Sequence, residues 1–266
     1  MDQPFFVVDA FTQEPFRGNP AAVVPLSGWP SDSWLQNVAM EMNHAETAFF
    51  APEGDGFRLR WFTPTVEVEL CGHATLATAK VLFQTGKLMS GAAVHFQTRS
   101  GLLAVRANGD DFAMDFPLEP AKEASIPDGL LEGLGLHPVF VGKNRMDYLV
   151  QLENENAVRA LKPVLTQLEK IPCRGIIVTA AGNPGSYDCV SRFFAPNAGV
   201  NEDPVTGSAH CCLADFWSRK LNKHLLTGYQ ASSRGGEVGM EIVGNRVILK
   251  GKAVLVAKGQ LMTRPL

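Results

Sequence analysis

The chain has 266 residues, of which 45% are apolar, and a formal net charge of −3 without any run of Lys or Arg. This composition excludes intrinsic disorder and predicts one large domain or two modest ones with a substantial core. It argues against nucleic-acid and membrane partners, since the charge offers nothing to phosphates and no apolar stretch reaches the roughly 18 residues of a membrane span.

The N-terminal residues and the cysteines bear on the cellular compartment. No basic residue precedes Arg17, so the chain does not begin with the pattern of a secretory signal. The number of cysteines is odd, and no two of them have C-x-x-C spacing. We therefore expect reduced thiols in a cytoplasmic protein, at Cys71, Cys173, Cys189, Cys211 and Cys212.

The first half predicts two helices and several strands. Ser31 is a typical cap for a helix that ends near Met42, and residues 57–62 alternate apolar and basic side chains, as in a strand with one buried face. A glycine then precedes a largely apolar helix over 73–84. Strands are expected to follow at 94–98, 102–107 and 112–116.

The second half repeats this order. A short helix is expected at 155–160 and a long apolar one at 208–221, and strands follow at 237–243, 246–250 and 253–256. Because the two long helices are apolar on most of their circumference, each is predicted to be buried. A central helix wrapped by antiparallel strands, twice over, fits this order of elements.

Three short segments of the first half recur in the second. The segment 60–64 recurs at 192–196, 71–74 at 206–209, and Gln97 with Gly101 recurs as Gln230 with Gly235, at offsets that agree within three residues. We interpret the chain as two similar domains that arose by duplication. The first comprises residues 1–117 and is completed by 257–266, and the second comprises residues 118–256.

Two helix starts are the first candidates for chemistry. Gly72 and Gly207 stand at matched positions before the two buried helices. The unpaired N–H groups and partial positive charge of a helix N-terminus suit a substrate carboxylate or a developing carbanion. Each glycine alone is explained by a tight strand-to-helix turn. Their occurrence at matched repeat positions favours a functional role.

Glu46 is a candidate proton carrier. It precedes the short apolar run 47–51, so partial burial would raise its pKa and suit it to general acid–base catalysis. From the residues alone, the alternative of a solvated glutamate at a strand edge is favoured.

Four further residues have both a functional and a structural interpretation. Asp203 precedes the second helix start, where acidic capping residues are common. Cys71 would have a lowered pKa at a helix start, although buried structural cysteines are more frequent. His73 and His210 can position a substrate or simply be hydrogen-bonded in the core. No three ligands have zinc-like spacing, so no metal is expected, and no phosphate-binding loop, dinucleotide fingerprint or G-x-S-x-G turn is present.

At these motifs the chain resembles the phenazine-biosynthesis PhzF-like family. The resemblance extends from residue 5 to about residue 257 and looks especially close to the eukaryotic MAWD-binding-protein-like branch around 60–76 and 202–210. It is specific because several motifs occur together. The matching segments are 9–12, 15–24, 46–49, 60–64, 67–68, 71–75 and 202–210.

The resemblance implies an α+β fold of the diaminopimelate-epimerase-like type, in which two pseudo-symmetric domains each form an antiparallel β-barrel around a central helix. It also implies a cofactor-free isomerase that forms a homodimer and acts on a small carboxylate, amino-acid-like or dihydroaromatic. Glu46, His73 and Asp203 match the positions expected to be catalytic. The positions expected to bind substrate are Asn19, Cys71, Gly72, Thr206, Gly207 and Ser208.

One departure from the epimerases of this fold separates the possible mechanisms. Those epimerases use one thiol from each half, whereas Cys71 has Thr206 as its repeat counterpart. A hydroxyl cannot replace a thiol as a base at neutral pH. Proton transfer by a single carboxylate, Glu46, is therefore the preferred mechanism. A racemase or epimerase that uses Cys71, and a ligand-binding or protein-interaction module without turnover, are the alternatives.

Overall fold

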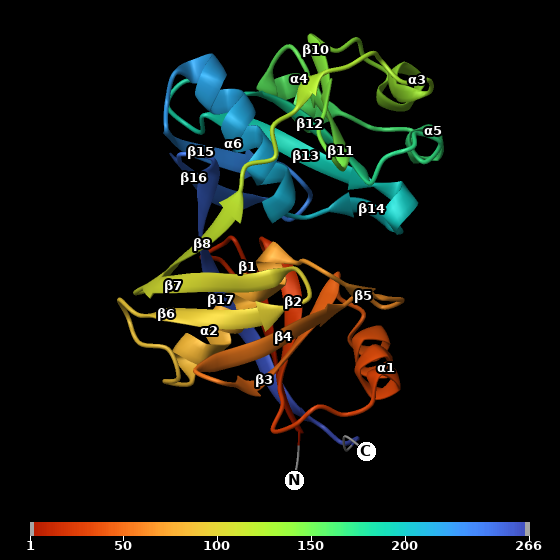
Figure 1. Cartoon of the computed structure of the whole chain (residues 1–266). Helices are drawn as coiled ribbons and strands as arrows, with labels where there is room; N and C mark the ends of the chain where they lie inside the picture. The colour runs from red at the N-terminus through yellow and green to blue at the C-terminus, as the bar shows by residue number, and fades with distance from the viewer. Residues whose placement is uncertain (1–2, 264–266) are drawn as a thin grey trace. The chain divides into compact units, whose positions relative to one another are not determined.

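The computed structural model describes residues 3–263, and the chain divides into two compact units (Figure 1). Unit 1 contains the residues up to Asp115 and those from Lys250 on, and unit 2 is Phe116–Leu249. From the sequence, we expected the first domain to end at residue 117 and to resume at residue 257. The chain leaves unit 1 within β8 (Asp111–Pro117) and returns within β17 (Arg246–Leu261). No helix in the described part of the chain is both long and apolar enough to cross a membrane.

Unit 1 contains a ring of eight strands. They follow one another in the order β1, β2, β3, β4, β6, β7, β8 and β17, and β17 pairs with both β1 and β8. The small strand β5 pairs with β4. The bounds are β1 Gln3–Ala10, β2 Asn19–Pro25, α1 Asp32–Met42, β3 Glu46–Glu53, β4 Gly56–Phe62, β5 Glu67–Val68, α2 Gly72–Gln84, β6 Ala93–Thr98 and β7 Gly101–Asn108.

Unit 2 repeats the pairing order of unit 1. Its strands pair in the series β9, β10, β11, β12, β13, β15 and β16, and β14 pairs with β13. The bounds are β9 Lys122–Glu123, α3 Leu130–Leu134, β10 Phe140–Lys143, β11 Asp147–Gln151, α4 Glu155–Ala160, α5 Leu165–Leu168, β12 Gly175–Ala181, β13 Cys189–Ala195, η1 Pro196–Ala198, β14 Val200–Asp203, α6 Gly207–Leu221, β15 Leu225–Gln230 and β16 Gly236–Val243.

The strands are not all antiparallel, which corrects the sequence expectation. In unit 1, β2 and β3 are parallel, as are β4 and β6; in unit 2, β11 and β12 are parallel, as are β13 and β15. Each parallel pair is joined by a crossover that contains a helix, because parallel neighbours cannot be connected by a tight turn. The mixed pairing therefore follows from where α1, α2, α4, α5 and α6 stand in the chain.

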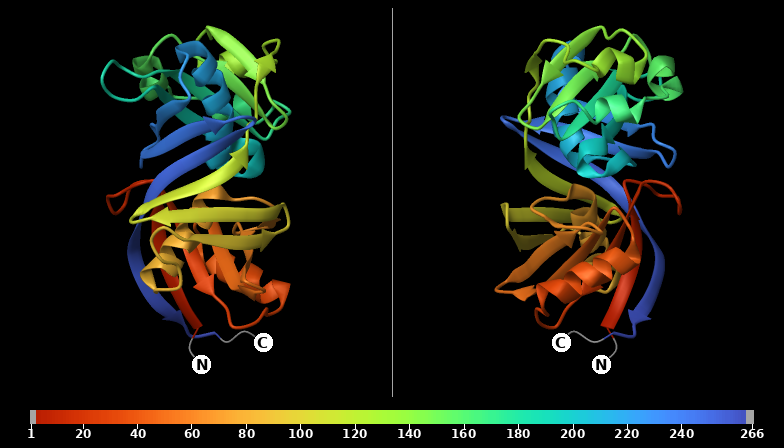
Figure 2. Two further views of the ribbon diagram at one scale, coloured as in Figure 1. Left: turned by 60° about the vertical axis from the view of Figure 1, so that its left-hand side comes forward. Right: turned by 90° about the vertical axis from the view of Figure 1, so that its right-hand side faces the viewer.

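The two long helices are buried, as their sequence predicted. Ten residues of α2 and nine of α6 are buried, and α2 lies against β1, β2, β3 and β7 (Figures 1 and 2). Because the side chains of Thr75 and Thr78 are fully buried, their hydroxyls donate to carbonyls one turn back, at 2.6 and 2.8 Å. The cap of α1 is also confirmed, since the Ser31 hydroxyl accepts from the Trp34 N–H.

Three local expectations are wrong. The two strands predicted at 246–250 and 253–256 form the single strand β17; Gly251 marks a close approach by the Phe11 ring, which lies 2.4 Å from where a Cβ would stand. Strand β4 is covered on both faces at Arg60, which is only 8% exposed. The strand pairing makes Thr98 the counterpart of Gln230, because Thr98 pairs with Gly101 as Gln230 pairs with Gly236. The sequence match of Gln97 with Gln230 is therefore off by one residue, and the Gln97 side chain lies on the opposite face of the sheet.

Candidate active site

Glu46 lies beside the start of the buried helix of unit 1. It is the first residue of β3 and pairs in parallel register with Ala21 of β2. One carboxylate oxygen, Oε2, is 3.2 Å from Nε2 of His73, and the Glu46 side chain is 19% exposed. The carboxylate is therefore half-shielded beside another polar group, which differs from the solvated strand-edge glutamate favoured by the sequence alone.

His73 has a polar neighbour at each ring nitrogen. It is the second residue of α2 and is 5% exposed, and its Nδ1 lies 3.2 Å from the side-chain nitrogen of Asn19. Because an amide N–H only donates, Nδ1 accepts and the ring proton is on Nε2, which faces Glu46. Burial, and secondarily the neighbouring His44, lower the pKa of His73 to about 3. His73 is therefore neutral at pH 7, and its Nε2 lies 3.2 Å from the Glu46 carboxylate.

Cys71 completes this cluster from the N-cap of α2. Its Sγ is 3.5 Å from Nδ1 and 4.0 Å from Nε2 of His73, and the residue is 6% exposed. Gly72 is the first residue of the helix, so unpaired backbone N–H groups of the first turn lie next to these side chains. One carboxylate, one imidazole, one thiol and a helix N-terminus thus meet within unit 1.

A second cluster stands at the start of α6 in unit 2. Thr206 is the N-cap and its hydroxyl donates to Oδ2 of Asp203 at 2.5 Å, while Gly207 and the half-buried Ser208 begin the helix. Fully buried Gln230 fixes this turn: its Oε1 accepts from the Thr206 N–H at 2.9 Å, and its Nε2 donates to the Asp203 carbonyl at 2.7 Å. The sequence pointed to Gln230 only as a repeat anchor.

His210 is a structural residue of this second helix. It is fully buried, and its Nδ1–H donates to the Thr206 carbonyl at 2.8 Å. Burial lowers its pKa to about 4, so the ring is neutral at pH 7. In unit 1, Thr75 bonds in the same way to the carbonyl of Cys71. The two N-caps are therefore tied to the following turn by equivalent side chains.

A repeated ion pair, which the sequence patterns did not single out, stands behind each helix start. Arg60 of β4 donates two parallel bonds of 2.7 Å to Glu67, and Arg192 of β13 donates two of 2.7 and 2.8 Å to Glu202. Bidentate pairs fix orientation as well as distance. Each arginine therefore ties its strand to the segment leading into the buried helix of its unit.

The nine predicted site residues thus form two groups. Asn19, Glu46, Cys71, Gly72 and His73 lie together in unit 1, and Asp203, Thr206, Gly207 and Ser208 lie together in unit 2. The roles assigned to them stay predictions, because proximity within a unit does not identify a catalytic group.

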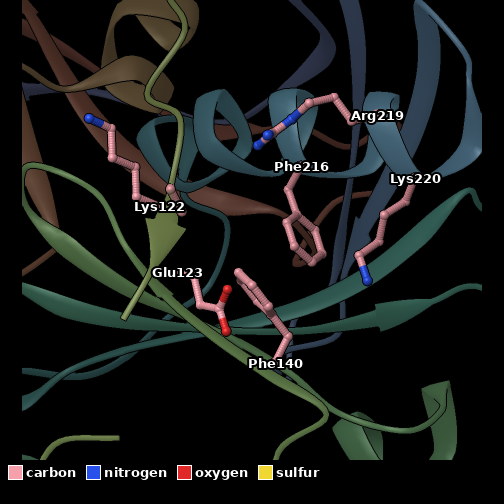
Figure 3. Close-up of a pocket in the computed structure, with 7 residues that line it drawn as sticks. Lys122, Glu123, Phe140, Phe216, Arg219 and Lys220 are labelled. Carbon is pink, nitrogen blue, oxygen red and sulfur yellow. The ribbon is translucent and has the colours of Figure 1, made fainter. Parts of the chain in front are cut away.

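A surface pocket of about 450 Å³ lies elsewhere in unit 2 and contains none of these residues (Figure 3). The rings of Phe140 and Phe216 stand 5.3 Å apart in it, and Nζ of Lys220 is 4.9 Å from the Phe216 ring centre. Two of its cations already have protein partners: Arg219 pairs with an aspartate and Lys220 with a glutamine oxygen. The lining residues are Ala121, Lys122, Glu123, Phe140, Phe216, Arg219 and Lys220.

Fold and site define a mixed α+β protein in which a carboxylate and a neutral histidine meet at the start of a buried helix. Comparison with known proteins identifies the family. The chain belongs to the family described as phenazine biosynthesis-like protein, PhzC–PhzF, which matches residues 8–259.

Relatives and solved structures extend over nearly the whole chain. An uncharacterized isomerase of Halalkalibacterium halodurans is 48% identical over 263 residues, covering 98% of this chain and 99% of that protein. The phenazine biosynthesis-like domain-containing protein of Homo sapiens is 39% identical over 287 residues, with the same coverage. The bacterial relative is thus more similar than this mammalian one. A PhzF-family crystal structure from Enterococcus faecalis superimposes with a TM-score of 0.94 at 42% identity, covering 99% of this chain and all of that one.

Proposed function

We propose that the protein is a cofactor-independent isomerase that moves a proton on a small carboxylate substrate, with Glu46 as the general acid and base. The relatives named as isomerases support the reaction class. The observation that carries the proposal is the 3.2 Å contact between Glu46 Oε2 and His73 Nε2 at the start of α2. The contributions of Asp203, Thr206, Gly207 and Ser208 stay part of the prediction.

Each group in unit 1 has a defined task in this proposal. The Glu46 carboxylate takes a proton from an activated carbon and returns it to another one, a type of catalysis that contributes typically about 10²–10⁴-fold. His73 presents Nε2 to the carboxylate at 3.2 Å, and Asn19 holds the ring from the other side. The first-turn N–H groups of α2, beginning at Gly72, favour the substrate carboxylate.

The decisive experiment compares glutamine substitutions of two glutamates that lie at opposite ends of β3. A panel of small carboxylates is screened for thermal stabilisation, and any compound that binds is followed for deuterium uptake from D₂O. Glu46→Gln should lose turnover by at least about 10²-fold while retaining ligand binding. Glu53→Gln, at the exposed end of β3, should behave as the unaltered protein. Full activity in Glu46→Gln would remove this residue from the mechanism.

A second candidate function is racemisation or epimerisation with Cys71 as a base. The 3.5 Å separation of Cys71 Sγ and His73 Nδ1 favours it, since the thiol lies within the same cluster. The N-cap of α6 is Thr206, whose hydroxyl is far too weak an acid to supply a second base at neutral pH. Deuterium incorporation at a stereocentre that is lost in Cys71→Ser would replace the first proposal by this one.

The proposal extends to the whole molecule. We propose that unit 2 is a second barrel around α6, related to unit 1 by duplication, and that the protein is a cytoplasmic homodimer. The repeated pairing order of the two units supports the duplication. Light scattering on the purified protein tests the dimer. A folded protein that binds carboxylates but exchanges no substrate proton in D₂O would instead be a binding module.

A further inference from the structure

Three side chains at the start of α2 offer donor atoms that zinc prefers. A Glu46 oxygen, a His73 nitrogen and the Cys71 sulfur all lie within 4.8 Å of one another. Cys71 and His73 are buried and Glu46 is half-buried. Carboxylate, imidazole and thiolate are the three ligand types found in protein zinc sites. The spacing argument against a metal does not apply to this set, because Glu46 reaches the helix from a separate strand.

The Glu46–His73 separation is close to the one that a tetrahedral ion requires, whereas the Cys71 sulfur is farther from Nε2. Bond lengths of about 2.0–2.1 Å to nitrogen, 2.0–2.2 Å to oxygen and 2.3 Å to sulfur place neighbouring ligands roughly 3.3–3.6 Å apart. The Glu46 oxygen is 3.2 Å from His73 Nε2, and the Cys71 sulfur is 4.0 Å from the same atom. The Cys71 sulfur is nearer to Nδ1, at 3.5 Å, so it must move to another rotamer on the Nε2 side of the ring before all three side chains can bind one ion.

The charge of the ligands and the orientation of the His73 ring also suit a bound dication. A thiolate and a carboxylate together neutralise a dication, which offsets the unfavourable position of a cation at a helix N-terminus. When Nε2 of His73 binds a metal, Nδ1 carries the proton and needs an acceptor. Asn19 stands 3.2 Å from Nδ1, and rotating its amide by half a turn presents the oxygen there.

We propose that Glu46, Cys71 and His73 bind one divalent cation of the zinc type, with unit 1 supplying all three protein ligands and the fourth position left open. Zn²⁺ then occupies the carboxylate assigned to proton transfer, so it inhibits turnover; this consequence alone rests on the proposed function. The binding itself is independent of what the protein catalyses.

The test titrates metal-free protein with Zn²⁺ by calorimetry and with Co²⁺ by absorption spectroscopy. We expect one ion per chain and a near-ultraviolet thiolate-to-cobalt band. Cys71→Ser should abolish the band and weaken Zn²⁺ binding by more than about 100-fold, because even losing a partner of a ligand costs 10–100-fold. Glu46→Gln and His73→Gln should also weaken binding, and Asn19→Ala should do so by about 10–100-fold.

The matched control is Cys173→Ser, which removes a half-buried free thiol from unit 2 and should leave the affinity unchanged. A second measurement needs no variant: Zn²⁺ should protect Cys71 from iodoacetamide in the unaltered protein, as read by mass spectrometry of the modified peptide. Failure to bind Zn²⁺, equal affinity in Cys71→Ser, or alkylation at an unchanged rate would each overturn the site. An inactive Glu46→Gln with no Zn²⁺ binding in the unaltered protein would leave the proposed function intact.

Discussion

Acid should destabilise unit 2 through His210. This residue is fully buried, its Nδ1–H is bonded to the Thr206 carbonyl, and its Nε2 has no hydrogen-bond partner among the described residues. Burial lowers its pKa to about 4, against about 6.5 in an unfolded chain. As the pH falls, the unfolded chain therefore takes up the proton first. The contribution to stability is complete above about pH 6.5 and is lost as the pH falls from there toward 4.

The magnitude follows from these two pKa values. Each pKa unit corresponds to 1.36 kcal/mol, so acidification from pH 7 to pH 5 should remove about 2 kcal/mol through His210 alone. The assay is urea unfolding at several pH values for the unaltered protein and for His210→Asn, whose amide can still donate to Thr206. The variant's stability should fall about 2 kcal/mol less over this pH range, whatever its stability at pH 7.

The exposed His224 of the same unit provides the control, and His224→Asn should follow the unaltered protein at every pH. Parallel stability curves for the unaltered protein and His210→Asn would refute the reasoning. Such a result would mean that His210 is protonated in the folded state, and that its surroundings solvate the charge.

Two further predictions concern the polar contacts behind the helix starts. Arg192→Met should lower the free energy of unfolding by about 3 kcal/mol, because it leaves a part-buried carboxylate uncompensated; Arg60→Met should cost less, since Arg99 also pairs with the acceptor Glu67. Urea unfolding checks the order, and the reverse order would contradict it. Gln230→Leu should cost about 2–3 kcal/mol, because it removes the amide that bonds both the Thr206 N–H and the Asp203 carbonyl, whereas exposed Gln97→Leu should stay within about 0.5 kcal/mol. Equal effects of the two glutamine variants would argue against this role.

The buried helices could be predicted closely because their signals are local. The opening glycines, the apolar circumference of the helices and the Ser31 cap are properties of neighbouring residues, and the observed bounds agree within one residue. The helices α3 and α5 were not predicted, because segments of five and four residues are too short to show a period.

Contacts between distant segments could not be derived in this way. Nothing in the sequence around Glu46 indicates His73, because the contact depends on which strand follows β2 in the ring. The parallel pairing that places β3 there depends in turn on the α1 crossover. Gln230 could have been recognised only with the correct strand register, since a shift of one residue reverses the direction of a side chain.

The strand register also shows that the two units differ where chemistry is expected. Arg60 pairs across the strands with Phe49, and its counterpart Arg192 pairs with Val178. Counting back three residues along β3 and β12 places Gly175 at the position of Glu46. A Cβ on this glycine would lie 2.3 Å from the Phe193 ring, so an aromatic ring fills the space beside it.

The two units thus share the helix start and the arginine–glutamate pair, but only unit 1 has the carboxylate. At the helix start of unit 2, Thr206 and Ser208 stand where unit 1 has Cys71 and His73. Proton exchange by two matched bases requires a titratable group at both positions, and a threonine hydroxyl does not ionise near neutral pH. This asymmetry favours a single carboxylate that removes and returns a proton over two equivalent thiols, and that carboxylate, Glu46, lies in unit 1.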